Sequence, residues 1–176
     1  TGGYFMTVNF GDGTTIASGG ALGKVLQVQH SMLKTSNSLS ISGNTFRDIG
    51  LSVNITPSAS SSKILIWYSV HTHGPSGYRS AQIIFRNSTQ IGRADTQGNR
   101  ARVTTSQGNI QSDGSHMTNL GMTILDEPNT TSQITYKIQG HVESNGTMYI
   151  NRAATTGNNF SQYRPVSAIS VMEIGA

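Results

Sequence analysis

The sequence contains no cysteine, few charged residues and no long hydrophobic run. None of its 176 residues is Cys, and only 11% are Asp, Glu, Lys or Arg. The missing cysteines exclude a disulfide framework, a thiolate metal site and a cysteine nucleophile. No apolar stretch approaches the roughly 18 residues of a membrane-spanning helix, so we expect no membrane insertion. The chain opens at Thr1 without a basic and apolar leader, so we expect a fragment or a processed product.

The few charges are not arranged as they are in nucleic-acid-binding proteins. The chain has 12 Lys and Arg against 8 Asp and Glu, a net charge of +4, and a pI near 9.6. The only local concentration of basic residues consists of Arg93, Arg100 and Arg102, interrupted by Asp95. Nucleic-acid-binding proteins usually carry a basic stripe with aromatic residues between the charges. We therefore expect no nucleic-acid partner.

Uncharged polar residues dominate the composition. Ser, Thr, Asn and Gln supply 66 residues, more than a third of the chain, while Ile, Val and Thr recur throughout. A disordered polar chain is usually poor in β-branched residues and has a high net charge. The composition therefore predicts a folded, β-rich protein, and the length predicts one domain at about 150 residues per domain.

Alternation of apolar and polar residues is the main periodic signal, and it is clearest in residues 132–143, 51–56 and 25–32. Such segments are typical of antiparallel strands with one face towards a core. Residues 64–68 and 168–174 are apolar on both faces, as expected for central strands whose second face is covered, in one reading by another subunit. We predict an antiparallel, jelly-roll-like β-sandwich of about eight to ten strands with little helix.

Turn signals divide the chain into a short leading segment and a head. Residues 1–22 are rich in Gly and Thr and are predicted to form a neck, and residues 23–176 form the sandwich. Asn145-Gly146 stands between alternating runs and predicts a two-residue hairpin. The longest polar, weakly periodic stretch covers residues 94–116, and connections of that length are usually functional or mobile.

The residues that could carry catalysis or bind a metal form no complete site. His71 and His73 would share one face of a strand, but a metal site needs about four ligands, so a hydrogen-bonded pair is the favoured interpretation. Asp126 and Glu127 are adjacent and precede Pro128, which favours a role in a turn over acid–base chemistry. No nucleophile elbow or phosphate-binding loop is present. We predict that the protein is not an enzyme and has no cofactor.

Loops that combine aromatic residues with arginine are the best candidates for ligand binding. Tyrosine stacks on the faces of sugars, and arginine binds carboxylates and hydroxyls through its planar fork. The alternative is a tyrosine packed over a strand end beside a solvated arginine. The candidate receptor-binding residues are Tyr78, Arg79, Arg100, Arg102, Phe160, Tyr163 and Arg164.

Eight short motifs occur in an order that resembles a known family. They are GKVLQV (23–28), TPSASSSKILI (56–66), RNSTQI (86–91), GNRAR (98–102), LDEP (125–128), ITYKIQ (134–139), YINR (149–152) and SAISVMEI (167–174). In this order they resemble the C-terminal domains of fibre and virion structural proteins of tailed bacteriophages, especially marine and cyanobacterial phages. The resemblance covers residues 23–176, and it carries over no binding residues because the motifs mark the scaffold.

The resemblance implies a homotrimeric, non-enzymatic virion component that contacts other virion proteins and, at its exposed end, a polysaccharide or receptor on the host surface. The low-charge, polar surface agrees with this expectation. The leading hypothesis is the head domain of a tail fibre or spike. The alternative is a capsid decoration or tail-assembly domain that binds no receptor.

Overall fold

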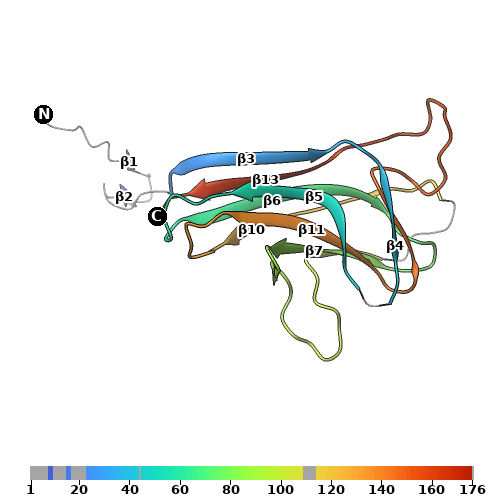
Figure 1. The fold of residues 1–176 in the computed structure, drawn as a ribbon, viewed down its shortest axis with the longest axis horizontal. Helices are drawn as coiled ribbons and strands as arrows, with labels where there is room; N and C mark the ends of the chain where they lie inside the picture. The colour runs from blue at the N-terminus through green and yellow to red at the C-terminus, as the bar shows by residue number, and fades with distance from the viewer. Residues whose placement is uncertain (1–7, 10–14, 17–22, 44, 109–113, 176) are drawn as a thin grey trace, which may run out of the picture.

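The structure of the chain, a computed structural model, describes residues 8–9, 15–16, 23–43, 45–108 and 114–175. The regular structure in these ranges is β-strand, and the main strands form two antiparallel sheets packed face to face (Figure 1). The prediction of an antiparallel β-sandwich is therefore confirmed. None of the described segments forms a helix long and apolar enough to cross a membrane.

The first sheet contains six strands and is organised around the long strand β6. One edge of β6 pairs with β10, and the other edge pairs with β13 and then, near its end, with β12. The outer partners are β3 on β13 and β4 on β12. The strands are β3 (Val25–Leu33), β4 (Asn37–Ile41), β6 (Lys63–His73), β10 (Thr118–Asp126), β12 (Gly146–Ile150) and β13 (Ser167–Ile174).

The second sheet has five strands in the order β5-β11-β7, with the short strands β8 and β9 both on the far edge of β7. Residues 49–51 of β5 oppose the single residue 138 of β11 in a bulge, and Gly50 there has a φ of 89°, which favours glycine. The strands are β5 (Arg47–Ile55), β7 (Ser80–Arg86), β8 (Thr89–Ile91), β9 (Thr105–Gln107) and β11 (Ile134–Val142).

The core lies between the two sheets and is built by strand alternation. On β5 every second residue from Ile49 to Ile55 is buried, and the residues between them are exposed. Opposite them, Ile64, Ile66 and Tyr68 of β6 are also buried. Each aliphatic side chain buried in this way contributes about 1.5–3 kcal/mol. Ile66, in the apolar segment 64–68, therefore lies in the core.

A buried polar contact joins the two sheets near one end of the core. Asp126 of β10 accepts hydrogen bonds from Arg86 of β7 at 3.0 Å and from the Tyr136 hydroxyl of β11 at 2.6 Å. Burial, together with the hydrogen bond to Asp126, raises the pKa of Tyr136, so this hydroxyl remains a donor. The neighbouring Glu127 pairs with Lys63 at 2.6 Å instead. These contacts show a structural role for both acids.

The predicted hairpin at Asn145-Gly146 is wrong. β11 ends at Val142 in the second sheet and β12 begins at Gly146 in the first, and β12 pairs with β4 and β6 rather than with β11. Asn145 accepts a hydrogen bond from the backbone N–H of Gly43 at 2.7 Å. A Cβ at position 146 would lie 2.8 Å from Pro75, so glycine serves a close approach rather than a tight turn.

The neck predicted for residues 1–22 lies almost wholly outside the described residues. Within it the structure describes one short antiparallel pair, β1 (Val8–Asn9) with β2 (Thr15–Ile16). The neck therefore remains a prediction.

Candidate functional site

The loop between β12 and β13 forms a pocket at one end of the sandwich. β3 begins and β13 ends at the opposite end, so the loop lies far from the point where the chain enters the sandwich (Figure 1). The pocket has a volume of about 400 Å³ and is called the Arg152 pocket below. Its lining residues are Ser36, Arg152, Thr156, Gly157, Asn158, Asn159, Gln162, Tyr163 and Arg164.

Hydrogen bonds from Asn151 hold the start of this loop against the turn between β3 and β4. Its backbone has a φ of 55°, a left-handed conformation that asparagine adopts more readily than most residues. Its buried side chain donates from Nδ2 to the carbonyls of Leu33 at 2.7 Å and Thr35 at 3.1 Å. Its Oδ1 accepts from the hydroxyl of Ser167 at 2.5 Å. These bonds place Ser36 and Arg152 on the same pocket wall.

His71 forms hydrogen bonds with the end of the same loop. Its Nδ1 lies 3.0 Å from the carbonyl oxygen of Val166, which can only accept, so this nitrogen carries the proton. Its backbone N–H donates to Ser167 Oγ at 3.0 Å, and its carbonyl accepts from the N–H of Asn151 at 2.9 Å. Nδ1 of His73 similarly contacts the carbonyl of His116 at 2.5 Å. In the described ranges no three His, Asp or Glu side chains gather as metal ligands.

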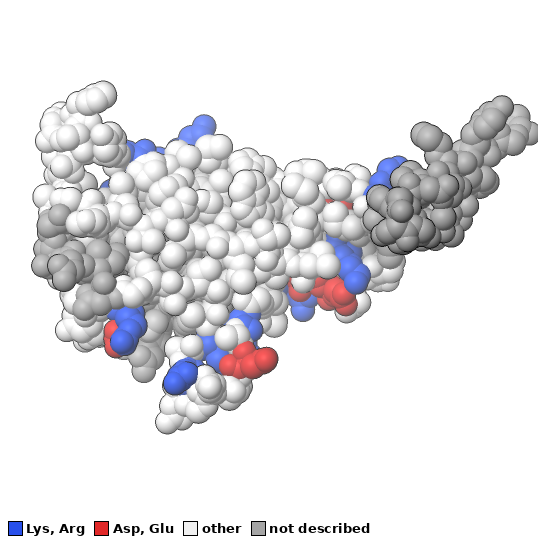
Figure 2. Space-filling model, turned by 180° about the vertical axis from the view of Figure 1, so that it is seen from behind, with Lys and Arg blue, Asp and Glu red and all other residues white. Residues whose placement is uncertain are grey.

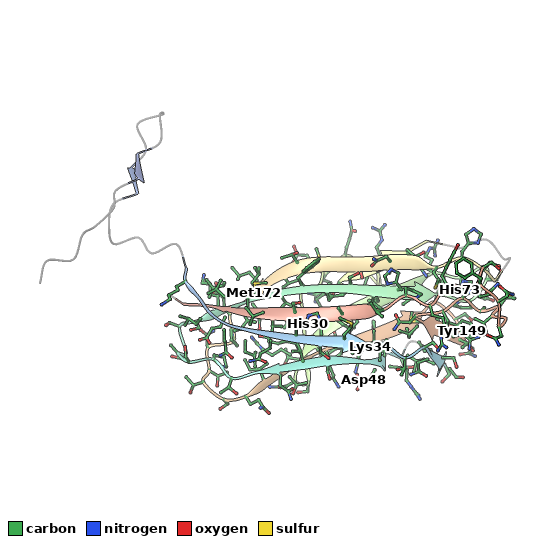
Figure 3. All side chains as sticks on the ribbon, turned by 90° about the horizontal axis from the view of Figure 1, so that it is seen from above. His30, Lys34, Asp48, His73, Tyr149 and Met172 are labelled. Atoms are coloured by element: carbon green, nitrogen blue, oxygen red, sulfur yellow. The ribbon has the colours of Figure 1, made fainter. Side chains whose placement is uncertain are left out.

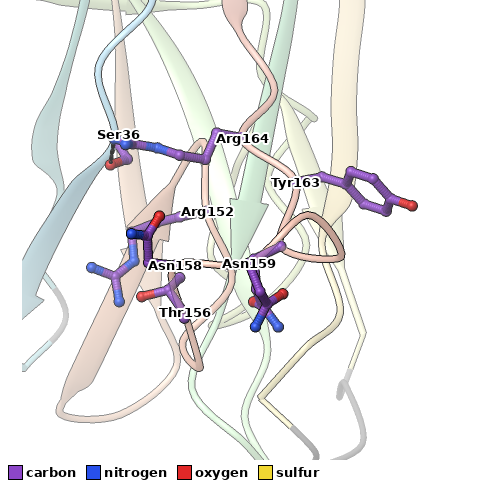
Figure 4. A pocket seen from close by; sticks show the side chains of 9 residues that line it. Ser36, Arg152, Thr156, Asn158, Asn159, Tyr163 and Arg164 are labelled. Carbon is purple, nitrogen blue, oxygen red and sulfur yellow. Dashed lines mark hydrogen bonds between the residues drawn. The ribbon is translucent and has the colours of Figure 1, made fainter.

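Two arginines supply the charge of the pocket. The guanidinium of Arg152 donates to the carbonyls of Ala153 and Ala154, both at 3.0 Å, and lies 4.9 Å from the centre of the Tyr149 ring. Arg164 donates to Ser36 Oγ at 2.7 Å, the dashed contact in Figure 4. The described residues that line the pocket include no Asp or Glu. The pocket is therefore positively charged and otherwise polar.

The predicted aromatic residues of this loop are exposed, but they do not cover the charged wall. Phe160 is 99% exposed and Tyr163 is 71% exposed. Figure 4 shows the Tyr163 ring directed away from Arg152 and Ser36. Asn159 orders the loop between them, because its Oδ1 accepts from both N and Oγ of Ser161 and its carbonyl accepts from the N–H of Gln162.

A second pocket brings together two other predicted residues, Arg79 and Arg100. It has a volume of about 680 Å³, lies between residues 99–103 and the outer side of β7 and β11, and is called the Arg79 pocket. Arg79 forms an ion pair with Glu143 at 2.8 Å, and Arg100 donates to Gln97 at 2.6 Å. Glu143 therefore cancels part of the positive charge of the Arg79 pocket, whereas no described acid lines the Arg152 pocket.

Tyr78 and Arg102 line neither of these pockets. Tyr78 lies in the turn that follows β6, where its N–H donates to the carbonyl of Pro75 at 3.3 Å. Arg102 donates from Nε to the carbonyl of Ala94 at 2.6 Å, a hydrogen bond that joins the two ends of the segment 94–102. Both residues remain candidates only as sequence neighbours of residues that line the Arg79 pocket.

Arg152 and Ser36 were missed as site residues by sequence reasoning. Arg152 belongs to a motif that was interpreted as scaffold, and Ser36 lies more than a hundred positions away in the chain. One local signal was available for Arg152, because it precedes a polar run without acids. No local signal pointed to Ser36.

The outer side of the first sheet carries apolar side chains on four strands, with the polar residues His30, Ser170 and Thr123 in the row that contains Trp67. Residues opposite one another in an antiparallel pair point to the same side, and Met172 lies opposite both Val28 and Leu65, which in turn lies opposite Leu125. Figure 3 looks onto these strands. This surface is called the apolar face and comprises Val28, Met32, Leu65, Trp67, Leu125, Ala168 and Met172.

The apolar face corrects one sequence prediction. The apolar side of residues 25–32 was expected to face the core, but Val28 and Met32 lie on this outer surface and are 52% and 44% exposed. In residues 64–68 the inner side is covered within this chain, and Trp67 on the other side is 59% exposed. Figure 2 shows the molecule from behind, where most of the described surface is uncharged and the Lys, Arg, Asp and Glu side chains lie in small groups near its margins. Several large exposed apolar side chains gathered on one side of a sheet are typical of an interaction site.

Comparison with known proteins gives only a distant structural likeness. No protein-family model matches the chain, and no curated protein matches it. The chain is similar to the VP2 subviral particle of infectious bursal disease virus, with a TM-score of 0.42 and 12% identity over 86% of this chain and 39% of that one. A second structure of particles derived from this virus gives a TM-score of 0.40, again at 12% identity, over 85% and 39%. The chain spans about two fifths of those proteins, and such scores assign no function.

Proposed function

We propose that this chain is the non-enzymatic head domain of an external virion appendage, the tail fibre or spike of a tailed bacteriophage. In this proposal it assembles as a homotrimer and attaches the virion to a polysaccharide on the host surface. The observation that carries the proposal is the Arg152 pocket, a polar, positively charged pocket at the end of the sandwich farthest from the start of β3. The ordered sequence motifs support the assignment to a phage virion.

The geometry of the pocket suits a saccharide. Its volume of about 400 Å³ falls within the range of about 300–1,000 Å³ typical of small-molecule sites. Asn158, Asn159 and Gln162 offer amide donors and acceptors of the kind that recognise sugar hydroxyls. Three copies of such a pocket on one trimer would add avidity, which can exceed the affinity of a single site by about 10²–10⁴.

Whole-cell adsorption of the intact protein tests the attachment function. We expect Arg164→Ala to weaken adsorption at least tenfold, because it removes one of the two charges of the pocket. Tyr163→Ala should have a smaller effect, because its ring is directed away from the charged wall. Arg93→Ala is the matched control, since Arg93 contacts Gln90 and lines neither pocket. Unchanged adsorption of Arg164→Ala, with assembly intact, would contradict this placement of the site.

The second candidate function is a capsid decoration or tail-assembly domain without a receptor, and the apolar face favours it. That face offers a surface for other virion proteins whether or not the pocket is used. The two functions differ in one measurement: an assembled protein that adsorbs to no host cell and binds no surface polysaccharide would support the structural role. Release of reducing sugars from host polysaccharide would contradict both.

A further inference from the structure

The Arg152 pocket brings two arginines together with no acidic partner among the described residues, in contrast to Arg79 and Arg86. Arg79 is paired with Glu143 at 2.8 Å, and Arg86 is paired with Asp126 at 3.0 Å. Within the described part of the chain, neither Arg152 nor Arg164 forms an ion pair, and no described Asp or Glu lines the pocket. Two guanidinium groups therefore share one pocket in which no described acid neutralises their charge.

The two arginines are held in place by neutral groups. Arg152 is fixed by two backbone carbonyls and by the face of Tyr149, contacts that use Nε and one Nη and leave the other Nη without a hydrogen bond to the described residues. Arg164 uses one Nη for Ser36. Because these contacts restrain the side chains before a ligand arrives, less conformational entropy is lost when the remaining donors bind an anion.

The surroundings of these donors favour a sugar over a simple ion. Figure 4 shows the Asn158 amide beside the Arg152 side chain, with Thr156 and Asn159 on the adjoining loop. Amide and hydroxyl groups beside a guanidinium pair can bind ring hydroxyls while the arginines bind an acidic substituent. Charge-assisted bonds from arginine to carboxylate or phosphate are about twice as strong as neutral ones.

We infer that the Arg152 pocket selects an anionic sugar, a residue of an acidic polysaccharide whose carboxylate or phosphate group is bound by Arg152 and Arg164. This inference rests on the proposed attachment function and specifies its ligand class. The Arg79 pocket is not a second site of this kind, because Glu143 lines it and already forms an ion pair with Arg79.

The test uses polysaccharide extracted from cells to which the intact protein adsorbs, in three forms. One form is native, one has its carboxyl groups reduced to alcohols, and one has its phosphate groups removed. We expect binding measured by calorimetry to fall at least tenfold for one of the two modified forms, and that form identifies the acidic group. We also expect binding of the native form to weaken as salt is raised, because the attraction is partly screened.

Variants show whether the loss of binding arises in this pocket. Arg152→Gln and Arg164→Gln should each weaken binding of the native polysaccharide about tenfold and leave binding of the modified form nearly unchanged. Arg100→Gln and Arg93→Gln are the controls, since these arginines are exposed and lie outside the pocket. If Arg152→Gln does not fold, Arg164→Gln provides the test, because Arg164 is exposed and its side chain donates one hydrogen bond, to Ser36, among the described residues.

Different failures overturn different claims. Equal binding of all three forms would overturn the anionic ligand while leaving the attachment function in place. A preference for the native form that both glutamine variants retain would place the anionic site elsewhere and overturn this inference. Adsorption to no host cell and binding to no polysaccharide would overturn the attachment function and this inference together.

Discussion

The two outer sides of the sandwich are built by the same strand alternation but carry different chemistry. On the apolar face, four strands present large uncharged side chains such as Val28, Trp67 and Leu125. The outer side of the second sheet, called the polar face here, instead presents contacts such as Lys137–Asp48 at 3.1 Å and Thr135–Asn54 at 2.7 Å. The polar side chains of the polar face bond to one another within the chain, whereas the large apolar side chains of the apolar face remain exposed.

This difference indicates which side of the sandwich is free to associate. Polar side chains that pair with one another and with water gain little from a partner, since exposed ion pairs contribute about 0–1 kcal/mol. Exposed apolar area instead gains about 25 cal/mol per Å² when it is buried. The chain has no disulfide that could stabilise it otherwise. We therefore place the proposed contact between copies on the apolar face.

The largest expected effect comes from a charge on the inner side of β6. We expect Ile66→Asp to prevent folding, because Ile66 is fully buried and an unpaired buried charge costs several kcal/mol. Circular dichroism and thermal melting would show the loss. Soluble, assembled Ile66→Asp protein would contradict the assignment of the core.

The next residue on β6 tests the apolar face directly. Trp67→Asp should leave the fold intact but weaken association by about 2 kcal/mol or more, because large aromatic residues at interface centres contribute that much. Sedimentation across protein concentrations would measure the change. A wild-type protein that remains monomeric at micromolar concentration would contradict the proposed interface.

We expect the stability contributed by the buried Glu173, between the two faces, to depend on pH. Burial opposes ionisation of Glu173, but hydrogen bonds from Ser58 and Gln27 lower its pKa from 4.5 to about 2. A lowered carboxyl pKa means that its stabilisation is fully present above about pH 4.5 and is lost as the pH falls towards 2.

Glu173→Gln should therefore lower the free energy of unfolding by about 1.5–3 kcal/mol at neutral pH, the usual contribution of hydrogen bonds to a charged group. The difference from wild type should shrink as the pH falls below 4.5, the ordinary pKa of this carboxyl. Denaturant titrations at several pH values measure both quantities. A difference that does not depend on pH would show that the carboxylate charge contributes nothing.

The smallest effect is expected on the polar face. Lys137→Ala should change the free energy of unfolding by less than about 1 kcal/mol and leave association unchanged, because its pair with Asp48 is partly exposed. The same sedimentation and denaturant measurements apply. A loss of assembly comparable to that of Trp67→Asp would reverse the comparison between the two faces.

Local patterns predicted the strands well and their connections poorly. The alternation in residues 51–56 and 132–143 corresponds to β5 and β11, because burial of one side of a strand depends on a period of two. Asn145-Gly146 failed as a hairpin because the strands that flank it belong to different sheets. A dipeptide preference cannot indicate which sheet the next strand will join.

The candidate site likewise contains residues that local patterns predicted and residues that only the fold brings together. Tyr163 and Arg164 were found because aromatic and basic residues in a polar loop form a local signal. Arg152 and Ser36 complete the pocket only because Asn151 joins the turn after β3 to the end of β12. Contacts between residues more than a hundred positions apart leave no trace in a single sequence.

The sequence by itself determined that this chain is an all-β, weakly charged, disulfide-free domain, because alternation and composition are properties of each segment alone. Only the tertiary structure decided which apolar residues form the core and which form an uncovered face. It likewise decided which arginines pair with an acid and which meet only neutral described groups in the Arg152 pocket. Both outcomes depend on how strands distant in sequence pair in space, and that pairing is a property of the whole chain.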